Sequence, residues 1–260
     1  MKKYLNQIHR KGYLILNNIY SKRETHEFKI RLEKILINRI KKNKKTGNSL
    51  NQVMYSYFND DPYLLKLIYN PQIDKILKKI LDENYVLQSS NAQNRLLNKY
   101  KINKKSKDRG IGHTWHTDSK YLAGKRIGKG FSYLVIIALD EFTKINGPTK
   151  FIPRSLNKTK IPPRVISKNS KHVIKELIMS EGSICIMDTG LWHKAGKSSL
   201  NSRWSIFNIY SGWFVKPYFN YKPMYKKKIK QIYKKLLHGY SVPPEMNESR
   251  SSTVKKFKQI

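Results

Sequence analysis

Residues 183–210, SICIMDTGLWHKAGKSSLNSRWSIFNIY, carry the clearest fold signal in the chain. Two short runs with strand-like patterns, Ser183–Met187 and Ser202–Tyr210, lie on either side of a turn at Thr189-Gly190 and a polar loop, Gly196–Ser202. Short runs that are bounded by turn residues, with no helical pattern between them, are typical of antiparallel β-structure.

The same pattern of short strands and turns fills most of the chain after Glu83. Further strand-like runs are Tyr85–Leu87, Ala92–Asn98, Phe131–Leu139 and Lys150–Ile152. Turn signals separate the runs, at Asn146-Gly147-Pro148, Pro162-Pro163 and Glu181-Gly182. Many short strands without alternating helices predict a mainly β fold, an antiparallel sandwich or jelly roll.

Helices are expected on both sides of this β region. After a short strand at Gly12–Leu16, the segment Ser21–Glu24 fits a capping box, and apolar residues then recur with a helical period. Two more helices are predicted to begin near Asp61-Pro62 and at Pro71, where proline suits the first turn. A basic amphipathic helix is expected over Pro223–Leu237.

A length of 260 residues suits one well-cored domain. Within it, we expect a mostly helical part over residues 1–83 that packs on the core. Residues 84–215 should form the β core, and residues 216–260 a C-terminal helix and tail.

The chain is strongly basic, with 53 Lys and Arg against 17 Asp and Glu and a formal charge of +36. The lysines are spread along the whole chain, and Lys, Asn, Ile and Tyr, whose codons are A/T-rich, are all abundant, so genome composition explains much of the excess. Such a charge favours weak binding to polyanions. Because there is no zinc-finger spacing and no RNA-recognition signature, specific nucleic-acid binding is not predicted.

No membrane span is expected, because the longest apolar run, Tyr133–Leu139, is far shorter than the ~20 residues that a spanning helix needs. The N-terminal residues lack a clean apolar core and a small-residue cleavage site, and we interpret them as mature sequence. Cys185 is the only cysteine, so no intramolecular disulfide can form, which favours a cytoplasmic location.

His116 and Asp118 in GHTWHTDS, residues 112–119, form the first candidate metal-binding pair. On a strand, residues two apart point to the same face, so this imidazole and this carboxylate can reach one ion. With seven histidines in the chain a chance H-x-D pair is easy, so the hypothesis needs a third ligand.

His193 is the candidate third ligand, at the end of a buried-looking strand. Alternatively, it is a histidine at the edge of the core with a backbone partner. Arg203 follows after a polar loop, and a hairpin return would place it beside His193 and pointing into the same barrel. An inward guanidinium requires an anion, either the carboxylate of a bound co-substrate or an internal acid such as Asp188.

Two histidines, one carboxylate and open coordination positions are typical of the facial triad of non-heme Fe(II) oxygenases. Zinc is the main alternative metal, but an arginine placed to hold a second carboxylate favours iron with 2-oxoglutarate. Two non-oxidative alternatives stay open. One is a jelly-roll module that binds a sugar or a small acid, and the other is a polyanion-binding protein.

In their order and spacing, these motifs resemble the phytanoyl-CoA dioxygenase family of Fe(II)- and 2-oxoglutarate-dependent oxygenases. The matching pieces are GHTWHTDS, then NGPTKFIPRSL at Asn146–Leu156, then SEGSICIMDTGLWHKAGKSSLNSRWSIFNIYSGWFVKP from Ser180. The early GYLILNNIYSKRE and the late LLHGYSVPP also resemble the ends of family members. The resemblance implies a double-stranded β-helix, the cupin-like jelly roll, with flanking N-terminal helices.

The resemblance also implies roles for individual residues. His116, Asp118 and His193 match the iron ligands, and Arg203 matches the arginine that holds the distal carboxylate of 2-oxoglutarate. The candidates on the strand AQNRLLNK, which matches one lining the co-substrate site, are Gln93 and Arg95.

One position departs from the family pattern. Some members have a serine two residues after the distal histidine, which hydrogen-bonds the co-substrate carboxylate, and this chain has Ala195 there. Another group must make that bond, or it is absent. Asp118 is retained, whereas related halogenases carry a small residue in its place, so the resemblance implies hydroxylation or another oxidation and not halogenation.

The expected activity is therefore that of a dioxygenase that uses Fe(II), 2-oxoglutarate and O2. It would hydroxylate a C–H bond of a small-molecule substrate and release succinate and CO2. The basic loops Asn98–Arg109 and Asn157–Lys171 suggest an anionic substrate, although composition bias explains them nearly as well. The substrate's identity and the oligomeric state do not follow from the sequence.

Overall fold

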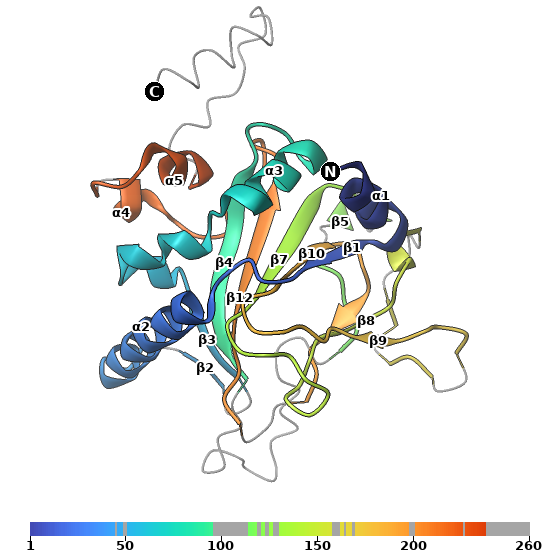
Figure 1. Ribbon diagram of the computed structural model, residues 1–260, viewed down its shortest axis with the longest axis horizontal. Helices are drawn as coiled ribbons and strands as arrows, with labels where there is room; N and C mark the ends of the chain where they lie inside the picture. The colour runs from blue at the N-terminus through green and yellow to red at the C-terminus, as the bar shows by residue number, and fades with distance from the viewer. Residues whose placement is uncertain are drawn as a thin grey trace, which may run out of the picture.

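Two β-sheets face each other in the computed structural model, and helices cover the outer side of the larger sheet (Figure 1). The structure describes residues 1–44, 46–48, 51–95, 114–118, 121–122, 125–126, 130–157, 162–163, 165–167, 170–197, 201–225 and 227–237. In this part of the chain, no helix is long and apolar enough to cross a membrane.

The larger sheet has the strand order β1-β10-β7-β12-β4-β3-β2, and every neighbouring pair is antiparallel. Its strands are β1 (Tyr13–Leu16), β2 (Gly47–Asn48), β3 (Asn51–Tyr55), β4 (Val86–Asn94), β7 (Ser132–Ala138), β10 (Ile184–Asp188) and β12 (Trp204–Ser211). The smaller sheet has the order β11-β8-β9, formed by β8 (Lys150–Phe151), β9 (Lys175–Glu176) and β11 (His193–Lys194). A separate short pair joins β5 (Tyr121–Leu122) and β6 (Lys125–Arg126).

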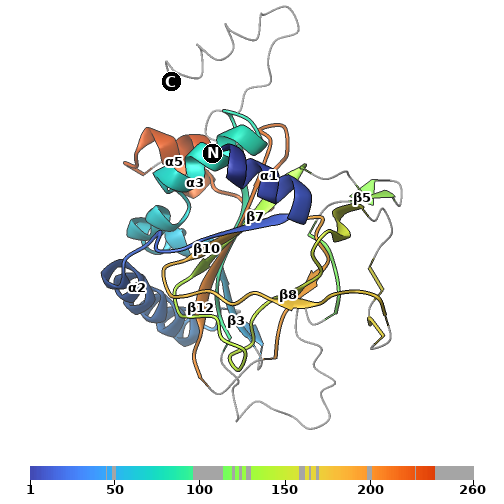
Figure 2. The same ribbon diagram turned by 45° about the vertical axis from the view of Figure 1, so that its right-hand side comes forward.

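The helices lie on the side of the larger sheet away from β8, as the rotated view in Figure 2 shows. They are α1 (Lys2–Lys11), α2 (Lys22–Lys41), α3 (Pro71–Ile80), α4 (Lys222–Tyr225) and α5 (Gln231–Leu236). The described residues also form 3-10 turns: η1 (Tyr57–Asn59) and η2 (Pro62–Leu67) lie between β3 and α3, and η4 (Ser155–Asn157) follows β8.

Strand β7 explains how the two layers are held together. Its residues, SYLVIIA, are all buried. Val135 and Ile137 pack into the core under the helices, while Leu134 and Ile136 pack into a second core between the two sheets. Because both faces of this strand are covered, its sequence reads as a continuous apolar run. The expected mainly β jelly-roll architecture is therefore confirmed.

Most predicted elements are present, and two predictions about their extent are wrong. Val86–Leu87 and Ala92–Asn94, from two separately predicted runs, belong to one strand, β4, because the polar residues between them continue the strand, with Ser89 and Asn91 facing the cavity between the sheets. The predicted helix Pro223–Leu237 is two short helices, α4 and α5. The sequence also did not predict α1 or β3.

The start of α2 follows the predicted local chemistry. The Ser21 side chain accepts a hydrogen bond from the Glu24 amide, and the Glu24 carboxylate accepts one from the Ser21 amide, as a capping box requires. Buried side chains on one face of α2, among them Phe28 and Leu32, then attach the helix to the sheet.

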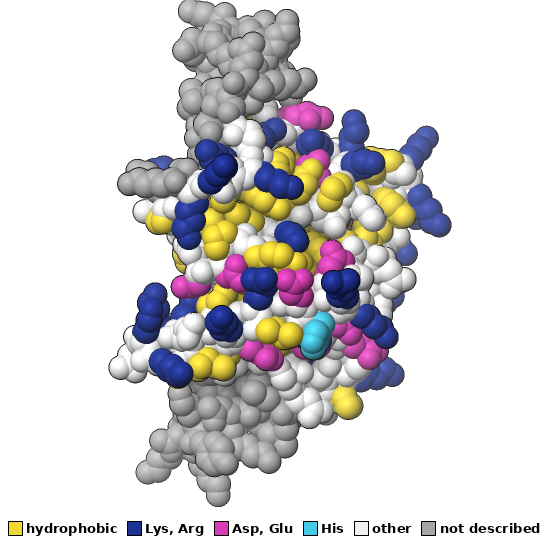
Figure 3. Space-filling model, turned by 60° about the vertical axis from the view of Figure 1, so that its left-hand side comes forward, with side chains coloured by type: hydrophobic (Ala, Val, Ile, Leu, Met, Phe, Trp, Pro, Cys, Tyr) yellow, Lys and Arg dark blue, Asp and Glu magenta, His cyan; other side chains and the backbone are white. Residues whose placement is uncertain are grey.

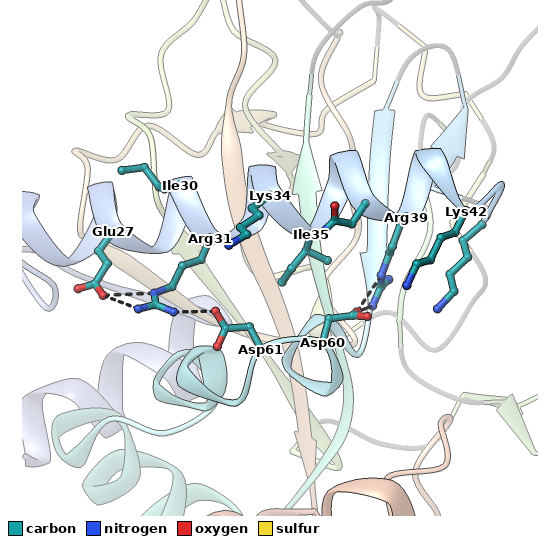
Figure 4. A pocket seen from close by; sticks show the side chains of 11 residues that line it. Glu27, Ile30, Arg31, Lys34, Ile35, Arg39, Lys42, Asp60 and Asp61 are labelled. Atoms are coloured by element: carbon teal, nitrogen blue, oxygen red, sulfur yellow. Dashed lines mark hydrogen bonds and ion pairs between the residues drawn. The ribbon is translucent and has the colours of Figure 1, made fainter.

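The outer side of α2 faces the turn at Asp60 and Asp61 across a groove of about 600 Å³ (Figure 4). Arg31 donates hydrogen bonds to Glu27 and Asp61, and Arg39 donates to Asp60. The ion pairs with Asp60 and Asp61 hold α2 against the turn that precedes η2.

Gly182, which precedes β10, allows a close contact with the segment between β1 and α2. Its φ is +77°, and its carbonyl accepts hydrogen bonds from the amides of Ile19 and Tyr20. A Cβ atom at this position would lie 2.1 Å from the Tyr20 carbonyl oxygen, so only glycine fits. Gly130 has a similar φ of +83°, but a Cβ there would come no closer than 3.6 Å to the Tyr133 hydroxyl.

The two glycines therefore form a matched pair for a stability test. Gly130→Ala should cost only the backbone strain of a left-handed alanine, about 1–2 kcal/mol. Gly182→Ala adds a collision with backbone atoms and should lower the free energy of unfolding by more than about 3 kcal/mol. Urea denaturation of both variants measures the difference, and equal losses would contradict the close approach at Gly182.

Candidate metal centre and co-substrate cavity

The segment that carries the H-x-D motif lies beside the edge of the smaller sheet. His116 and His193 form an antiparallel bridge, in which each amide donates to the other residue's carbonyl at 2.9 and 3.0 Å. Two residues on, the Asp118 amide donates to the Thr189 carbonyl at 2.9 Å. Backbone hydrogen bonds thus bring His116 and Asp118 to His193, although these residues are far apart in the sequence.

The three side chains converge on one point. One ligand atom from each of His116, Asp118 and His193 lies within 4.8 Å of the others. The Asp118 carboxylate is 3.3 Å from His193 Nε2 and 3.9 Å from His116 Nε2, and the two imidazole ring centres are 4.3 Å apart. The structure therefore assembles the three predicted ligands into a cluster that could hold a metal ion.

Backbone carbonyls orient both imidazoles. Nδ1 of His116 lies 2.8 Å from the Thr114 carbonyl, and Nδ1 of His193 lies 2.8 Å from the Leu191 carbonyl. With Nδ1–H donating to a carbonyl, the lone pair of each Nε2 faces the cluster, which is the usual outer support of a metal-bound histidine. His193 thus has the backbone partner expected of a core-edge histidine, and its other nitrogen still faces Asp118.

The protonation tendencies of the two histidines differ. Burial, and then the neighbouring His193, lowers the pKa of His116, which favours the neutral imidazole that a metal needs. Burial also opposes a charge on His193, but the Asp118 carboxylate outweighs it and raises the pKa of His193. The cluster therefore has the charge pattern of a site that binds a cation, with Asp118 as the attracting group.

The cluster opens into a cavity of about 320 Å³ between the two sheets. One wall of the cavity is polar and consists of β4 residues Ser89, Asn91, Gln93 and Arg95. A second wall is apolar and consists of Leu134, Phe207 and Ile209. The aromatic residues Tyr55, Tyr218 and Phe219 surround its mouth. The predicted site residues Gln93, Arg95 and Arg203 all line this cavity together with the three candidate ligands.

Arg95 and Arg203 are direct neighbours across the sheet. The Arg95 amide donates to the Arg203 carbonyl at 3.0 Å, next to the register pair of Asn94 and Trp204. Both side chains are almost fully buried, at 2% and 1% exposure. Like charges that are directly opposed on a sheet destabilise it, so a buried anion between them would relieve an unfavourable contact.

Arg203 is also short of hydrogen-bond acceptors. Its guanidinium lies 3.8 Å from the centre of the Phe142 ring, and its Nε and Nη1 have no partner within the described residues. Burial first, and the Arg95 guanidinium second, lower the pKa of Arg203 to about 9. Among these residues no acid forms an ion pair with it, and the Asp188 carboxylate instead accepts from the amides of Gly130 and Gly190.

The predicted hairpin between His193 and Arg203 is wrong. β11 pairs with β8 in the smaller sheet, whereas β12 pairs with β4 and β7 in the larger one. His193 and Arg203 are therefore carried by different sheets. His193 and Arg203 nevertheless face the same cavity, because the two sheets enclose it from opposite sides.

Ser205 is a buried polar residue near this cavity that the sequence did not single out. It lies two residues after Arg203 and so on the same face of the strand, and its hydroxyl has no partner in the described part of the chain. The two-residue spacing from Arg203 was the available signal. The basic loop Asn98–Arg109 lies outside the described residues, and Asn157–Lys171 is described only in part.

Comparison with known proteins agrees with this geometry. A family model described as phytanoyl-CoA dioxygenase (PhyH) matches residues 8–204. The chain belongs to the phytanoyl-CoA dioxygenase family. This is a family of non-heme iron dioxygenases that use 2-oxoglutarate, so the chain is an enzyme of that class. A search of curated proteins finds no match.

Several solved structures share the fold. HygX from Streptomyces hygroscopicus, with nickel, 2-oxoglutarate and hygromycin B bound, has a TM-score of 0.64 at 10% identity, over 84% of this chain and 90% of HygX. EctD from S. alaskensis, with 2-oxoglutarate and 5-hydroxyectoine, has a TM-score of 0.62 at 17% identity, over 82% and 76%. SnoK, a carbocyclase from nogalamycin biosynthesis, has a TM-score of 0.58 at 15% identity, over 82% and 84%.

The residues of this chain fit both cofactors of the family. Two imidazoles and one carboxylate that leave open positions suit Fe(II). Donors without partners on Arg203 and Ser205, close to a second guanidinium, suit a carboxylate of 2-oxoglutarate.

The strained arginine pair predicts an unusual stability effect. Arg203→Met keeps the bulk of the side chain and removes a buried charge without an acid partner, which is often neutral or stabilising by about 1–4 kcal/mol. In the absence of metal and 2-oxoglutarate, this variant should melt at or above the temperature of the unaltered protein.

Arg39→Met is the matched control, because Arg39 is ion-paired with Asp60. It should lower the melting temperature. Differential scanning calorimetry compares the two variants, and a clear loss of stability in Arg203→Met would indicate that Arg203 has an internal structural partner.

Proposed function

We propose that this enzyme hydroxylates a C–H bond of a small-molecule substrate and converts 2-oxoglutarate and O2 into succinate and CO2. The observation that carries the proposal is one cavity with two complementary ends. His116, Asp118 and His193 meet at one end, and Arg203 presents unpartnered donors to the same space.

In this proposal, His116 and His193 bind iron through Nε2, and Asp118 binds through its carboxylate. The carbonyls of Thr114 and Leu191 hold the rings in that orientation, so little side-chain freedom is lost when the metal binds. Three protein ligands leave positions for 2-oxoglutarate and O2. When bound, iron and 2-oxoglutarate supply the oxidising chemistry, and the protein positions the substrate and excludes side reactions.

Arg203 orients the co-substrate. We propose that its guanidinium holds the distal carboxylate through parallel charge-assisted hydrogen bonds. Arg95 adds a second positive charge opposite Arg203, and Gln93 lines the same wall. Gln93 is held in a row of amides, since it accepts from Asn51 at 3.1 Å and donates to Asn91 at 2.8 Å.

The rest of the cavity is assigned to the substrate. The side chains of Leu134, Phe207 and Ile209 give an apolar wall that suits a C–H bond, and the amide row gives hydrogen-bonding groups. At the mouth, the rings of Tyr55 and Phe219 pack at 4.8 Å. HygX was crystallised with hygromycin B and EctD with 5-hydroxyectoine, and a small-molecule substrate also suits a cavity of about 320 Å³.

The polyanion alternative gains no support from the face of the molecule that Figure 3 draws. On the face drawn in Figure 3, the Lys and Arg side chains are scattered among acidic and hydrophobic ones and form no single stripe. We also propose a cytoplasmic location, which the single cysteine of the sequence favours.

The first test of the proposal is removal of each ligand. His116→Ala, Asp118→Ala and His193→Ala should each reduce Fe(II)-dependent succinate formation by more than about 100-fold, because even outer-shell partners are worth about 10–100-fold. A double variant should be hardly worse than a single one, since the ligands act as a unit. Single-turnover assays with stoichiometric Fe(II) measure the loss.

His26→Ala, on the exposed surface of α2, is the control and should keep full activity. Succinate formation at the normal rate by any one of the three variants would remove that residue from the metal site. Full activity with Zn(II), without oxygen consumption, would overturn the oxygenase assignment itself.

The second test concerns Arg203. Arg203→Lys keeps the charge but loses the planar fork, so 2-oxoglutarate should bind at least about tenfold more weakly, while Mn(II) affinity changes little. Arg203→Ala should bind it more weakly still. Calorimetric titration of 2-oxoglutarate into Mn(II)-loaded protein measures both, and unchanged affinity in the alanine variant would exclude Arg203 from the co-substrate site.

A further inference from the structure

We propose that Asp188 is a positioning residue of the metal site, whose buried carboxylate fixes the turn Asp188–Leu191 and, through two carbonyl groups of that turn, the ligands Asp118 and His193. This inference rests on the proposed function, because it takes the cluster of His116, Asp118 and His193 as the metal ligands. It adds a residue that binds neither metal nor co-substrate but sets the geometry of those that do.

The turn is a short link between the two sheets. Asp188 is the last residue of β10 in the larger sheet, and His193 is the first residue of β11 in the smaller sheet. The chain therefore passes from one sheet to the other directly before the metal ligand. A shift of the turn would reach His193 without any long segment to absorb it.

Two carbonyl groups of the turn hold two of the three ligands. The Thr189 carbonyl accepts a hydrogen bond from the Asp118 amide at 2.9 Å, and the Leu191 carbonyl lies 2.8 Å from Nδ1 of His193. The ring of His116 depends instead on the Thr114 carbonyl, outside the turn. The distance between Asp118 and His193 is thus set by the conformation of this turn.

The Asp188 carboxylate supports the turn from within. One oxygen accepts a hydrogen bond from the Gly190 amide at 2.8 Å, and the other accepts from the Gly130 amide at 2.7 Å. The Asp188 carbonyl also accepts from the Leu191 amide at 3.0 Å. Asp188 is only 3% exposed, and hydrogen bonds from amides to a carboxylate are stronger than those to a neutral group. The side chain therefore fixes the peptide between Thr189 and Leu191.

The turn also holds both ends of the segment that follows the H-x-D motif. At the start of this segment, the Asp118 amide donates to Thr189, and at its end the Gly130 amide donates to Asp188. The hydroxyls of Thr189 and Ser132 lie 2.7 Å apart, and the Thr189 amide donates to the Ser132 carbonyl at 3.2 Å. Thr189 and Asp188 together fasten the turn to the start of β7.

The backbone of Asp188 has little freedom to adjust. Its amide donates to the Gly12 carbonyl at 2.9 Å on the β1 side, and its register partner on the other side is Tyr133 of β7. The carboxylate thus extends from a fixed point in the sheet. Since a precise metal site needs rigid support behind its ligands, we infer that this support exists before a metal binds.

The test begins with Asp188→Asn, which keeps the size of the side chain but replaces one acceptor oxygen with an NH2 group. One of the two glycine amides then loses its acceptor, and the turn must shift. Mn(II) should bind the metal-free variant at least about tenfold more weakly, the loss typical when outer support of a metal site is removed. Calorimetric titration at a temperature where the variant is fully folded measures the affinity.

A second measurement needs no metal. In the unaltered protein, the Nδ1–H group of His193 donates to the Leu191 carbonyl and should give a proton NMR resonance at low field. In Asp188→Asn this resonance should move upfield or disappear, because the carbonyl is displaced. A role in stability alone would change neither the resonance nor the metal affinity of the folded protein.

Asp74→Asn is the matched control. Asp74 is also buried, at 7% exposure, and its carboxylate accepts from the Tyr85 hydroxyl at 2.8 Å and pairs with Lys78 at 3.1 Å, but it lies on α3. This variant should melt at a lower temperature and bind Mn(II) normally. If Asp188→Asn does not fold, Thr189→Val decides, because it removes the hydroxyl that contacts Ser132. It should weaken Mn(II) binding, whereas Thr189→Ser should not.

Unchanged Mn(II) affinity in Asp188→Asn would overturn the inference, as would an unchanged His193 resonance or an equal loss of affinity in Asp74→Asn. If His193→Ala loses Mn(II) binding while Asp188→Asn keeps it, the proposed function stands and only the role of Asp188 fails. If the unaltered protein does not bind Mn(II), both fail together.

Discussion

The backbone bridge between His116 and His193 is the constraint on which the candidate site depends. Two reciprocal hydrogen bonds place the H-x-D segment beside the smaller sheet, and the Asp118 amide adds a third to the Thr189 carbonyl. These bonds are made by main-chain atoms, so they position the imidazoles and the carboxylate whether or not a metal is bound. The cavity between the two sheets then connects this cluster to Arg203 on the larger sheet.

The larger sheet contains unfavourable contacts on the side that faces this cavity. Arg95 and Arg203 oppose each other, Ser205 has a buried hydroxyl with no described partner, and polar side chains cover the inner face of β4. On its outer face the same sheet is mostly apolar and packs against the helices, and the buried Ser90 and Asn208 there are hydrogen-bonded. Stability therefore comes from the helix side and from β7, while on the cavity side the guanidinium of Arg203 and the hydroxyl of Ser205 keep donors without partners among the described residues.

Much of this was predictable from local sequence chemistry. The capping box at Ser21, the proline start at Pro71 and the apolar run of β7 each depend on neighbouring residues, and each was predicted correctly. Strand β4 was predicted as two separate strands, because its cavity-facing polar residues look like a loop in the sequence. The opposition of Arg95 and Arg203 depends on strand register, which the sequence does not reveal. Ser205 looks like an ordinary strand residue until its burial is known.

Anomalous X-ray diffraction from crystals soaked anaerobically with Mn(II) and 2-oxoglutarate tests the central claim most directly. We expect one metal peak within bonding distance of Nε2 of His116, Nε2 of His193 and the Asp118 carboxylate. The distal carboxylate of 2-oxoglutarate should lie on Arg203. A metal peak elsewhere, or a metal at this cluster with 2-oxoglutarate bound away from Arg203, would contradict the proposed site.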